Sequence, residues 1–68
     1  MKEKNLMIRE TLTLAVKKHQ ENKLMEAVDL YEKILKSQPN HIDANYNIAK
    51  AFYELRNIKK QLVTIKKP

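Results

Sequence analysis

Two apolar stripes at helical spacing, separated by one proline, constrain the fold of this chain more than any other feature. The first stripe comprises Leu24, Ala27, Val28, Tyr31, Ile34 and Leu35, and the second Ile42, Asn45, Ile48, Ala49, Phe52 and Leu55. Pro39 lies between them; it cannot donate a backbone hydrogen bond, and it pushes the residue before it out of helical geometry. The spacing therefore predicts helices over 24–37 and 41–55, each with one apolar face.

The turn between these helices also has its own signals. Asn40 is a good N-cap residue, and Asp43 stands where the acid of a capping box would. The connection is only a few residues long, so the two helices are expected to lie antiparallel and side by side.

Two further helices are expected on either side of this pair. One runs from near Asn5 to about Glu21 and is apolar on more than one face, so it should contact more than one neighbour. Asn22 tolerates the left-handed conformation that ends helices, which predicts a turn over 22–23. A second turn is expected over 56–57, with a fourth helix beginning at Ile58. Residues 1–7 are expected to be a frayed extension.

Composition excludes several classes of protein. The 68-residue chain has no cysteine and no glycine, so disulfides, thiolate metal sites and glycine-rich phosphate loops are all ruled out. No apolar run is long enough to span a membrane, and the N-terminus does not resemble a signal peptide. The expectation is one small all-α domain in a reducing compartment, the cytoplasm.

The net charge of +6 is unevenly distributed. Residues 1–34 carry seven Lys or Arg against six Asp or Glu, whereas residues 35–68 carry seven against two. A basic second half could bind nucleic acid or an acidic partner. Lysines also suit a solvated helix C-terminus, and this second interpretation is favoured because charge is a weak functional signal.

Catalysis and metal binding are not expected. The two histidines, His19 and His41, lie at opposite ends of different predicted helices, and Ser37 has no nearby base. No set of nucleophile, base and orienting residue can be drawn from the sequence. We therefore expect no enzyme activity, no metal and no cofactor.

The chain matches itself when it is shifted by thirty-four residues. Ile8 then meets Ile42, and Ala15 meets Ala49. The turn at 22–23 meets the turn expected at 56–57. Apolar residues meet apolar ones and small residues meet small ones, which indicates an internal repeat.

These residues resemble the tetratricopeptide repeat family, a helix–turn–helix repeat with the pattern W-x2-L-G-x2-Y, A-x3-F and a final proline. The residues at the positions of this pattern are Leu14, Ala15, Ala27, Tyr31 and Pro39 in the first unit, and Asn45, Ile48, Ala49 and Phe52 in the second. Thr11 and Asn45 replace the large aromatic residue, Lys18 replaces the tyrosine, and no glycine is present. The resemblance implies an α-solenoid type of fold with two stacked antiparallel units, 8–41 and a truncated 42–68.

The resemblance also implies a concave groove that holds a peptide, lined by the first helix of each unit. The residues carried over to it are Arg9, Leu12, Thr13, Val16, His19, Asp43, Tyr46, Asn47, Lys50 and Tyr53. Tyr46 and Tyr53 would be the anchors, Asn47 would bond a peptide backbone, and Lys50 or Arg9 would pair a carboxylate. The family's carboxylate clamp is not expected, because Leu12 and Val16 occupy its first-helix positions.

One such unit cannot bury its own apolar face, so units stack and end units usually carry a polar cap. No polar cap follows here, which predicts self-association, or a longer array of which this chain is a fragment. The expected oligomer interface comprises Ile58, Leu62, Val63 and Ile65. The expected function is a scaffold that binds a peptide or partner protein. The alternatives are a structural homo-oligomerisation unit, a nucleic-acid binder using the basic C-terminal helix, and the N-terminal piece of a larger protein.

Overall fold

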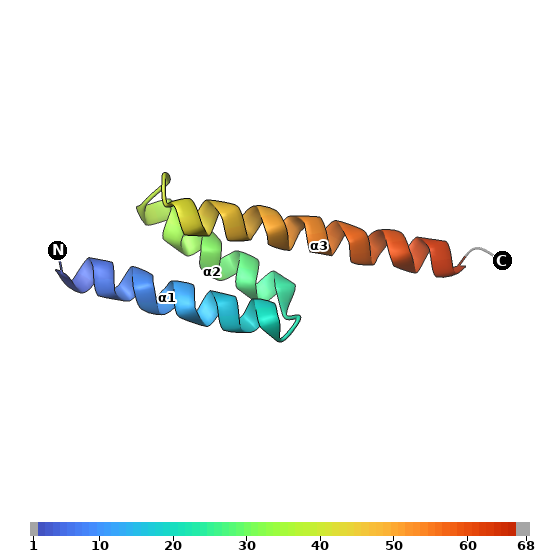
Figure 1. Cartoon of the computed structure of the whole chain (residues 1–68), viewed down its shortest axis with the longest axis horizontal. Coiled ribbons are helices and arrows are strands. Elements are labelled where there is room, and N and C mark those ends of the chain that lie inside the picture. The colour runs from blue at the N-terminus through green and yellow to red at the C-terminus, as the bar shows by residue number, and fades with distance from the viewer. Residues whose placement is uncertain (1, 67–68) are drawn as a thin grey trace.

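Three α-helices form the part of the chain that the structure describes. In the computed structural model the backbone is described for residues 2–66 and the side chains for residues 4–57. The helices are α1 (Lys2–Gln20), α2 (Leu24–Ser37) and α3 (Ile42–Lys66), and this part of the chain contains no strand. α1 and α3 run in the same direction on either side of α2, which is antiparallel to both (Figure 1). The predicted all-α class is confirmed.

The turn between α1 and α2 is held by backbone hydrogen bonds around a left-handed asparagine. Asn22 has a φ of 66°, and its N–H donates to the carbonyl of His19 at 3.0 Å. The N–H of Lys23 donates to the carbonyl of Lys18 at 2.8 Å. These two bonds form a Schellman motif, which satisfies the last carbonyls of α1. The turn predicted at 22–23 is confirmed.

The turn between α2 and α3 is capped by a histidine. The Nδ1 atom of His41 accepts a hydrogen bond from the backbone N–H of Ala44 at 3.0 Å, the geometry of an N-cap. The predicted cap, Asn40, is wrong by one residue because α3 begins directly after His41. The amide of Asn45 also donates to the carbonyls of Pro39 and His41, at 3.0 and 2.8 Å.

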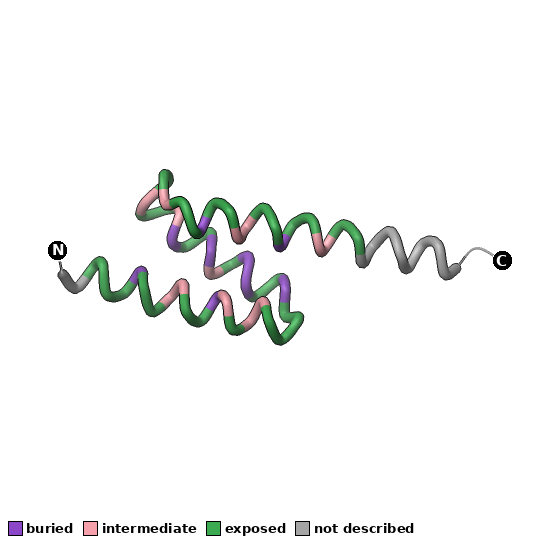
Figure 2. Tube along the Cα trace, viewed as in Figure 1, coloured by how far each residue is buried: buried purple, intermediate pink, exposed green. Residues whose placement is uncertain are grey.

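The core is centred on α2, which is buried along one broad face. The buried residues of α2 are Leu24, Ala27, Val28, Tyr31 and Ile34. Figure 2 shows buried positions along α2 and on the sides of α1 and α3 that face it. α1 contributes Ile8 and Ala15, and α3 contributes Ala44 and Ala51. Four alanines, Ala15 and Ala27 among them, have no exposed surface, so small side chains lie where the helices pack closely.

The predicted turn at 56–57 is wrong, because α3 continues without a break to Lys66. Comparison with the first turn gives the physical reason. In the thirty-four-residue alignment, left-handed Asn22 meets Arg56, and Asn57 falls one position later. A positive φ costs an arginine about 1–2 kcal/mol, whereas an asparagine tolerates it. The predicted fourth helix is therefore the second half of α3, and within residues 2–66 α1 and α2 form a hairpin that α3 does not repeat.

The continuity of α3 changes which of its faces is buried. The apolar positions that are buried or half-buried are Ala44, Ile48, Ala51 and Leu55. Four positions predicted to face inward are exposed instead, namely Ile42, Asn45, Ala49 and Phe52. They are exposed because no described helix folds back over them. In α1, Leu14, which fits the leucine of the repeat pattern, is 44% exposed.

Candidate functional site: a groove between α1 and α3

α1 and α3 border a shallow groove whose floor is Tyr31 of α2. The hollow has a volume of about 310 Å³. Its lining comes from all three helices and comprises Val16, His19, Gln20, Tyr31, Asn47, Lys50 and Glu54. A hollow of this size lies at the lower end of the range of ligand pockets.

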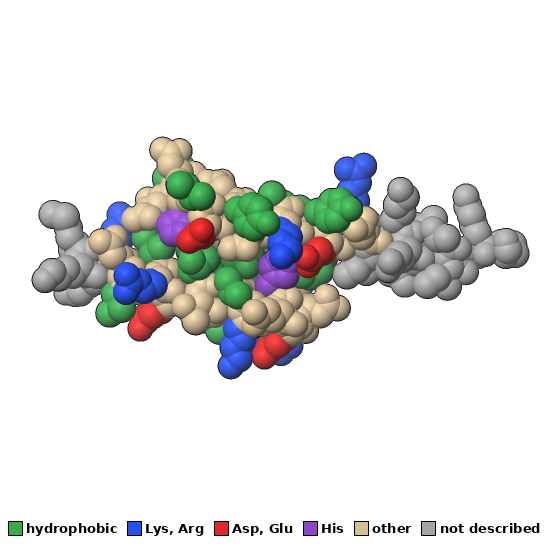
Figure 3. All heavy atoms as spheres, viewed as in Figure 1, with side chains coloured by type: hydrophobic (Ala, Val, Ile, Leu, Met, Phe, Trp, Pro, Cys, Tyr) green, Lys and Arg blue, Asp and Glu red, His purple; other side chains and the backbone are tan. Residues whose placement is uncertain are grey.

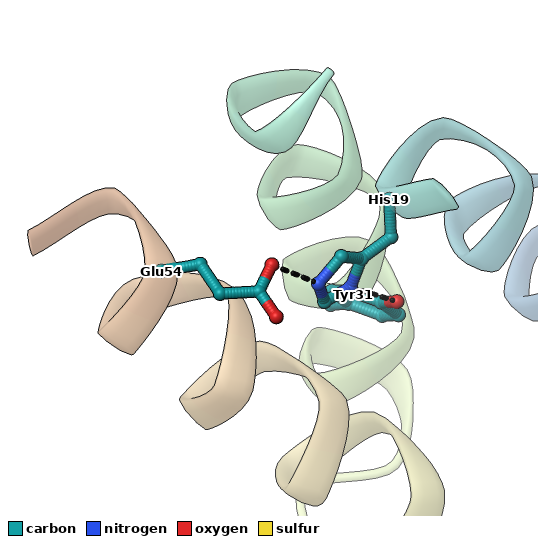
Figure 4. Close-up of polar contacts among 3 residues, drawn as sticks. All are labelled: His19, Tyr31 and Glu54. Carbon is teal, nitrogen blue, oxygen red and sulfur yellow. Dashed lines mark hydrogen bonds and ion pairs between the residues drawn. The ribbon is translucent and has the colours of Figure 1, made fainter. Parts of the chain in front are cut away.

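A row of three hydrogen-bonded side chains, one from each helix, crosses the groove. The Nδ1 atom of His19 on α1 lies 3.1 Å from the hydroxyl oxygen of Tyr31 on α2. The Nε2 atom of the same ring lies 2.8 Å from Oε1 of Glu54 on α3. Figure 4 shows the imidazole between the phenol and the carboxylate. Because α1 and α3 otherwise touch each other little, these hydrogen-bonded side chains are the main polar connection between the two helices.

With Glu54 ionised and His19 neutral, the chemistry of the three groups sets the direction of these hydrogen bonds. An ionised Glu54 can only accept, so Nε2–H of His19 donates to it. In a neutral ring the other nitrogen then accepts, and the hydroxyl of Tyr31 donates to Nδ1. The buried phenol is thereby satisfied, and no described buried side-chain polar atom lacks a partner.

The order carboxylate–imidazole–hydroxyl is also that of a catalytic nucleophile with its base. Tyr31, however, has no exposed surface, so its hydroxyl cannot reach a substrate. The arrangement acts structurally, as a connection that holds α3 against the α1–α2 hairpin. No sequence pattern indicates this connection, because Tyr31 and Glu54 lie 12 and 35 residues from His19 along the chain.

Alkaline pH is expected to destabilise the fold through Tyr31. Burial, and then the negative charge of Glu54, raise the pKa of Tyr31 above 10.0. The unfolded chain ionises this phenol near pH 10.0, whereas the folded chain keeps it neutral. Its contribution to stability is therefore fully present below pH 10.0 and is lost as the pH rises through the higher, folded-state pKa.

Urea unfolding from neutral pH to above pH 10.0 tests this expectation. The control is Tyr31→Phe, which keeps the ring and loses the titrating group. Its free energy of unfolding should be lower by about 0.5–1.5 kcal/mol near neutral pH, the net value of one hydrogen bond. The difference in free energy of unfolding between the wild type and the variant should become smaller above pH 10.0. A difference that stays constant with pH would contradict the assignment.

Four of the residues predicted to form the groove line it together, namely Val16, His19, Asn47 and Lys50. The others lie elsewhere. Leu12 is half-buried and packs against buried residues of the core. Arg9 and Thr13 line a separate hollow on α1. Asp43, Tyr46 and Tyr53 are exposed on α3 and do not line the hollow.

Gln20 and Glu54 line the groove but were not predicted. Gln20 follows His19 at the end of α1, so a helical wheel extended by one residue would have included it. Glu54 carried no signal in the sequence. The residues predicted as an oligomer interface, Ile58, Leu62, Val63 and Ile65, lie outside the residues whose side chains are described, as do the lysines at 59–67 that suggested nucleic-acid binding.

Two features are absent from the described residues. None of their helices is both long and apolar enough to cross a membrane. Within the same part of the chain, no group of three or more His, Cys, Asp or Glu side chains is arranged to hold a metal ion.

Comparison with known proteins adds no relative. No protein-family model, no curated protein and no solved structure matches this chain.

Proposed function

We propose that this chain is a tetratricopeptide-like interaction module that binds a segment of a partner protein in the groove between α1 and α3. The observation that carries the proposal is the convergence of Val16, Gln20, Asn47 and Lys50 around one hollow. In the proposed arrangement the α1–α2 hairpin is a first repeat unit, and the N-terminal half of α3 is the first helix of a second unit.

The lining suits a peptide backbone better than a small-molecule substrate. The amides of Gln20 and Asn47 each offer donors and an acceptor, which match the alternating N–H and C=O groups of an extended chain. Val16 offers apolar surface beside them. Lys50 forms no ion pair with another described residue, so its ammonium is available for a carboxylate of the partner.

The His19–Glu54 connection supports binding by making the groove rigid. Both walls are joined through it to the buried floor residue Tyr31. A groove that keeps its shape in the free state loses less conformational entropy on binding. The proposal is therefore of a preformed binding surface without catalysis.

Selection of peptides against the immobilised chain tests the proposal. Peptides enriched from a random displayed library would be titrated calorimetrically against the wild type and the double variant Gln20→Ala, Asn47→Ala. The double variant removes two hydrogen-bonding groups at about 0.5–1.5 kcal/mol each, so affinity should fall about tenfold. Lys36→Ala, at an exposed position in the last turn of α2, is the matched control and should not change affinity.

Circular dichroism should show the same helix content for all three proteins, because the altered side chains are not buried. Unchanged affinity of the double variant would contradict the groove as the binding site. Failure to enrich any peptide up to millimolar concentration would contradict peptide binding itself.

A further inference from the structure

α3 is apolar on two opposite faces, and only one of them is covered. The face toward the hairpin carries Ala44, Ile48, Ala51 and Leu55. On the other side lie Ile42, Tyr46, Ala49 and Tyr53, spaced by four, three and four residues, which places them in one row along the helix. We call this row the outer ridge.

The outer ridge is strongly exposed. Ile42 is 80% exposed, Tyr46 68% and Tyr53 66%, and Ala49 between them is also exposed. Figure 3 shows hydrophobic side chains gathered over α3 on the face that it displays. Single exposed apolar residues are ordinary, but a continuous row of them is typical of an interaction surface.

We propose that a second copy of this chain covers the outer ridge, with the two α3 helices antiparallel about a two-fold axis. The proposal shares one residue, Lys50, with the groove, but it does not depend on peptide binding there. It rests on two properties of the described residues, the order of large and small side chains along the ridge and the position of charges beside it.

The order of side-chain sizes fits itself in this orientation. When the two-fold axis passes midway between residues 46 and 49, Ile42 meets Tyr53 of the second copy. Tyr46 then meets the small side chain of Ala49. Each large side chain thus has a smaller one opposite, as close packing between two helices requires. In a parallel, in-register pair, tyrosine would instead meet tyrosine twice.

The charges beside the ridge select the same register. Asp43 and Lys50 are exposed on one flank, and neither pairs with another described residue. In the proposed register Asp43 of each copy lies beside Lys50 of the other, which gives two opposite-charge pairs. If the two α3 helices slid past each other by seven residues, Lys50 of one copy would lie beside Lys50 of the other, and Arg56 would enter the contact between the ridges. Electrostatic complementarity therefore favours one alignment over its nearest competitor.

The length of the ridge sets the expected strength. From Ile42 to Tyr53 it spans roughly 17 Å at about 1.5 Å per residue. A ridge this short buries less than the roughly 800 Å² per partner of a standard interface. A reversible, weak dimer is expected, and the α1–α2 hairpins lie on its outer sides because they pack on the opposite face of α3.

Sedimentation equilibrium of charge-swap variants tests this dimer from micromolar to millimolar concentration. Asp43→Lys and Lys50→Asp each turn two attractive pairs into two repulsive ones, so each single variant should dimerise about tenfold more weakly than the wild type. An equimolar mixture of the two should regain association, because every pair across the heterodimer is again of opposite sign. High salt should weaken all these differences.

The mixture distinguishes self-pairing from a structural effect of either substitution. Ala49→Glu, at the centre of the ridge, is a second variant and should give a monomer with unchanged helix content, since Ala49 is exposed. A wild type that stays monomeric at millimolar concentration would overturn the proposal and leave the ridge to a different protein. Single variants that dimerise like the wild type, or a mixture that does not regain association, would overturn it as well.

Discussion

Replacing Tyr31 by alanine is expected to leave the domain largely unfolded at room temperature. Tyr31 has no exposed surface, is among the largest fully buried side chains, and contacts residues of all three helices. Loss of a buried aromatic side chain typically costs about 3–5 kcal/mol. A core of this size supplies only about 3–5 kcal/mol of net stability, so the loss is comparable to the whole. His19 would also lose its hydrogen-bond partner.

Far-UV circular dichroism and urea unfolding measure this effect. The matched control is Tyr53→Ala, which removes the same side chain from an exposed position of α3 and should change stability by no more than about 0.5 kcal/mol. The two variants should be compared at micromolar concentration, below the range of the proposed dimer. A Tyr31→Ala variant with the helix content and cooperative transition of the wild type would refute the description of the core.

Replacing Ala15 by leucine is expected to cost about 1–3 kcal/mol or more, because the added atoms have no space. Ala15 has no exposed surface and packs with Ala27 and Tyr31 where α1 crosses α2. Larger side chains at such a position force helices apart or adopt unfavourable rotamers.

Ala49 offers an informative control for this substitution. It occupies the position equivalent to Ala15 in the thirty-four-residue repeat, yet it is exposed because α3 does not fold back on itself. Ala49→Leu should therefore change the free energy of unfolding by no more than about 0.5 kcal/mol. Equal destabilisation of the two variants would mean that Ala49 is buried against a neighbouring helix as Ala15 is, contrary to the structure.

The first hairpin was predictable because its boundaries depend on local chemistry. Asn22 adopts the left-handed conformation, and Pro39 ends the region in which α2 can continue. Both effects act within a few residues of the sequence. The end of α3 was not predictable in this way. The repeat suggested a turn, but the residue that would have to be left-handed is Arg56, and the helix continues through it.

The candidate site was predictable only where the resemblance to a repeat family supplied positions. His19 and Asn47 come from helices at opposite ends of the sequence, and the resemblance placed both on the same groove. Glu54 could not be found, because its role depends on lying 2.8 Å from a ring that is 35 residues away in the chain. The outer ridge was missed for a related reason. Its exposure follows from the continuity of α3, a property of the packed molecule.

The continuity of α3 is the central claim, since the free outer ridge and the single complete hairpin both follow from it. The chain contains no cysteine, so cysteines introduced at Asp43 and Lys66 can carry two nitroxide labels without further changes. Pulsed electron–electron double resonance measures the distance between the two labels, and diluting labelled chain in unlabelled chain removes distances between copies. An unbroken helix should give roughly 35 Å between the labelled positions. A second hairpin would instead bring them to about 10–15 Å, given an interaxial distance of about 8–10 Å. The short distance as the main population would contradict the account.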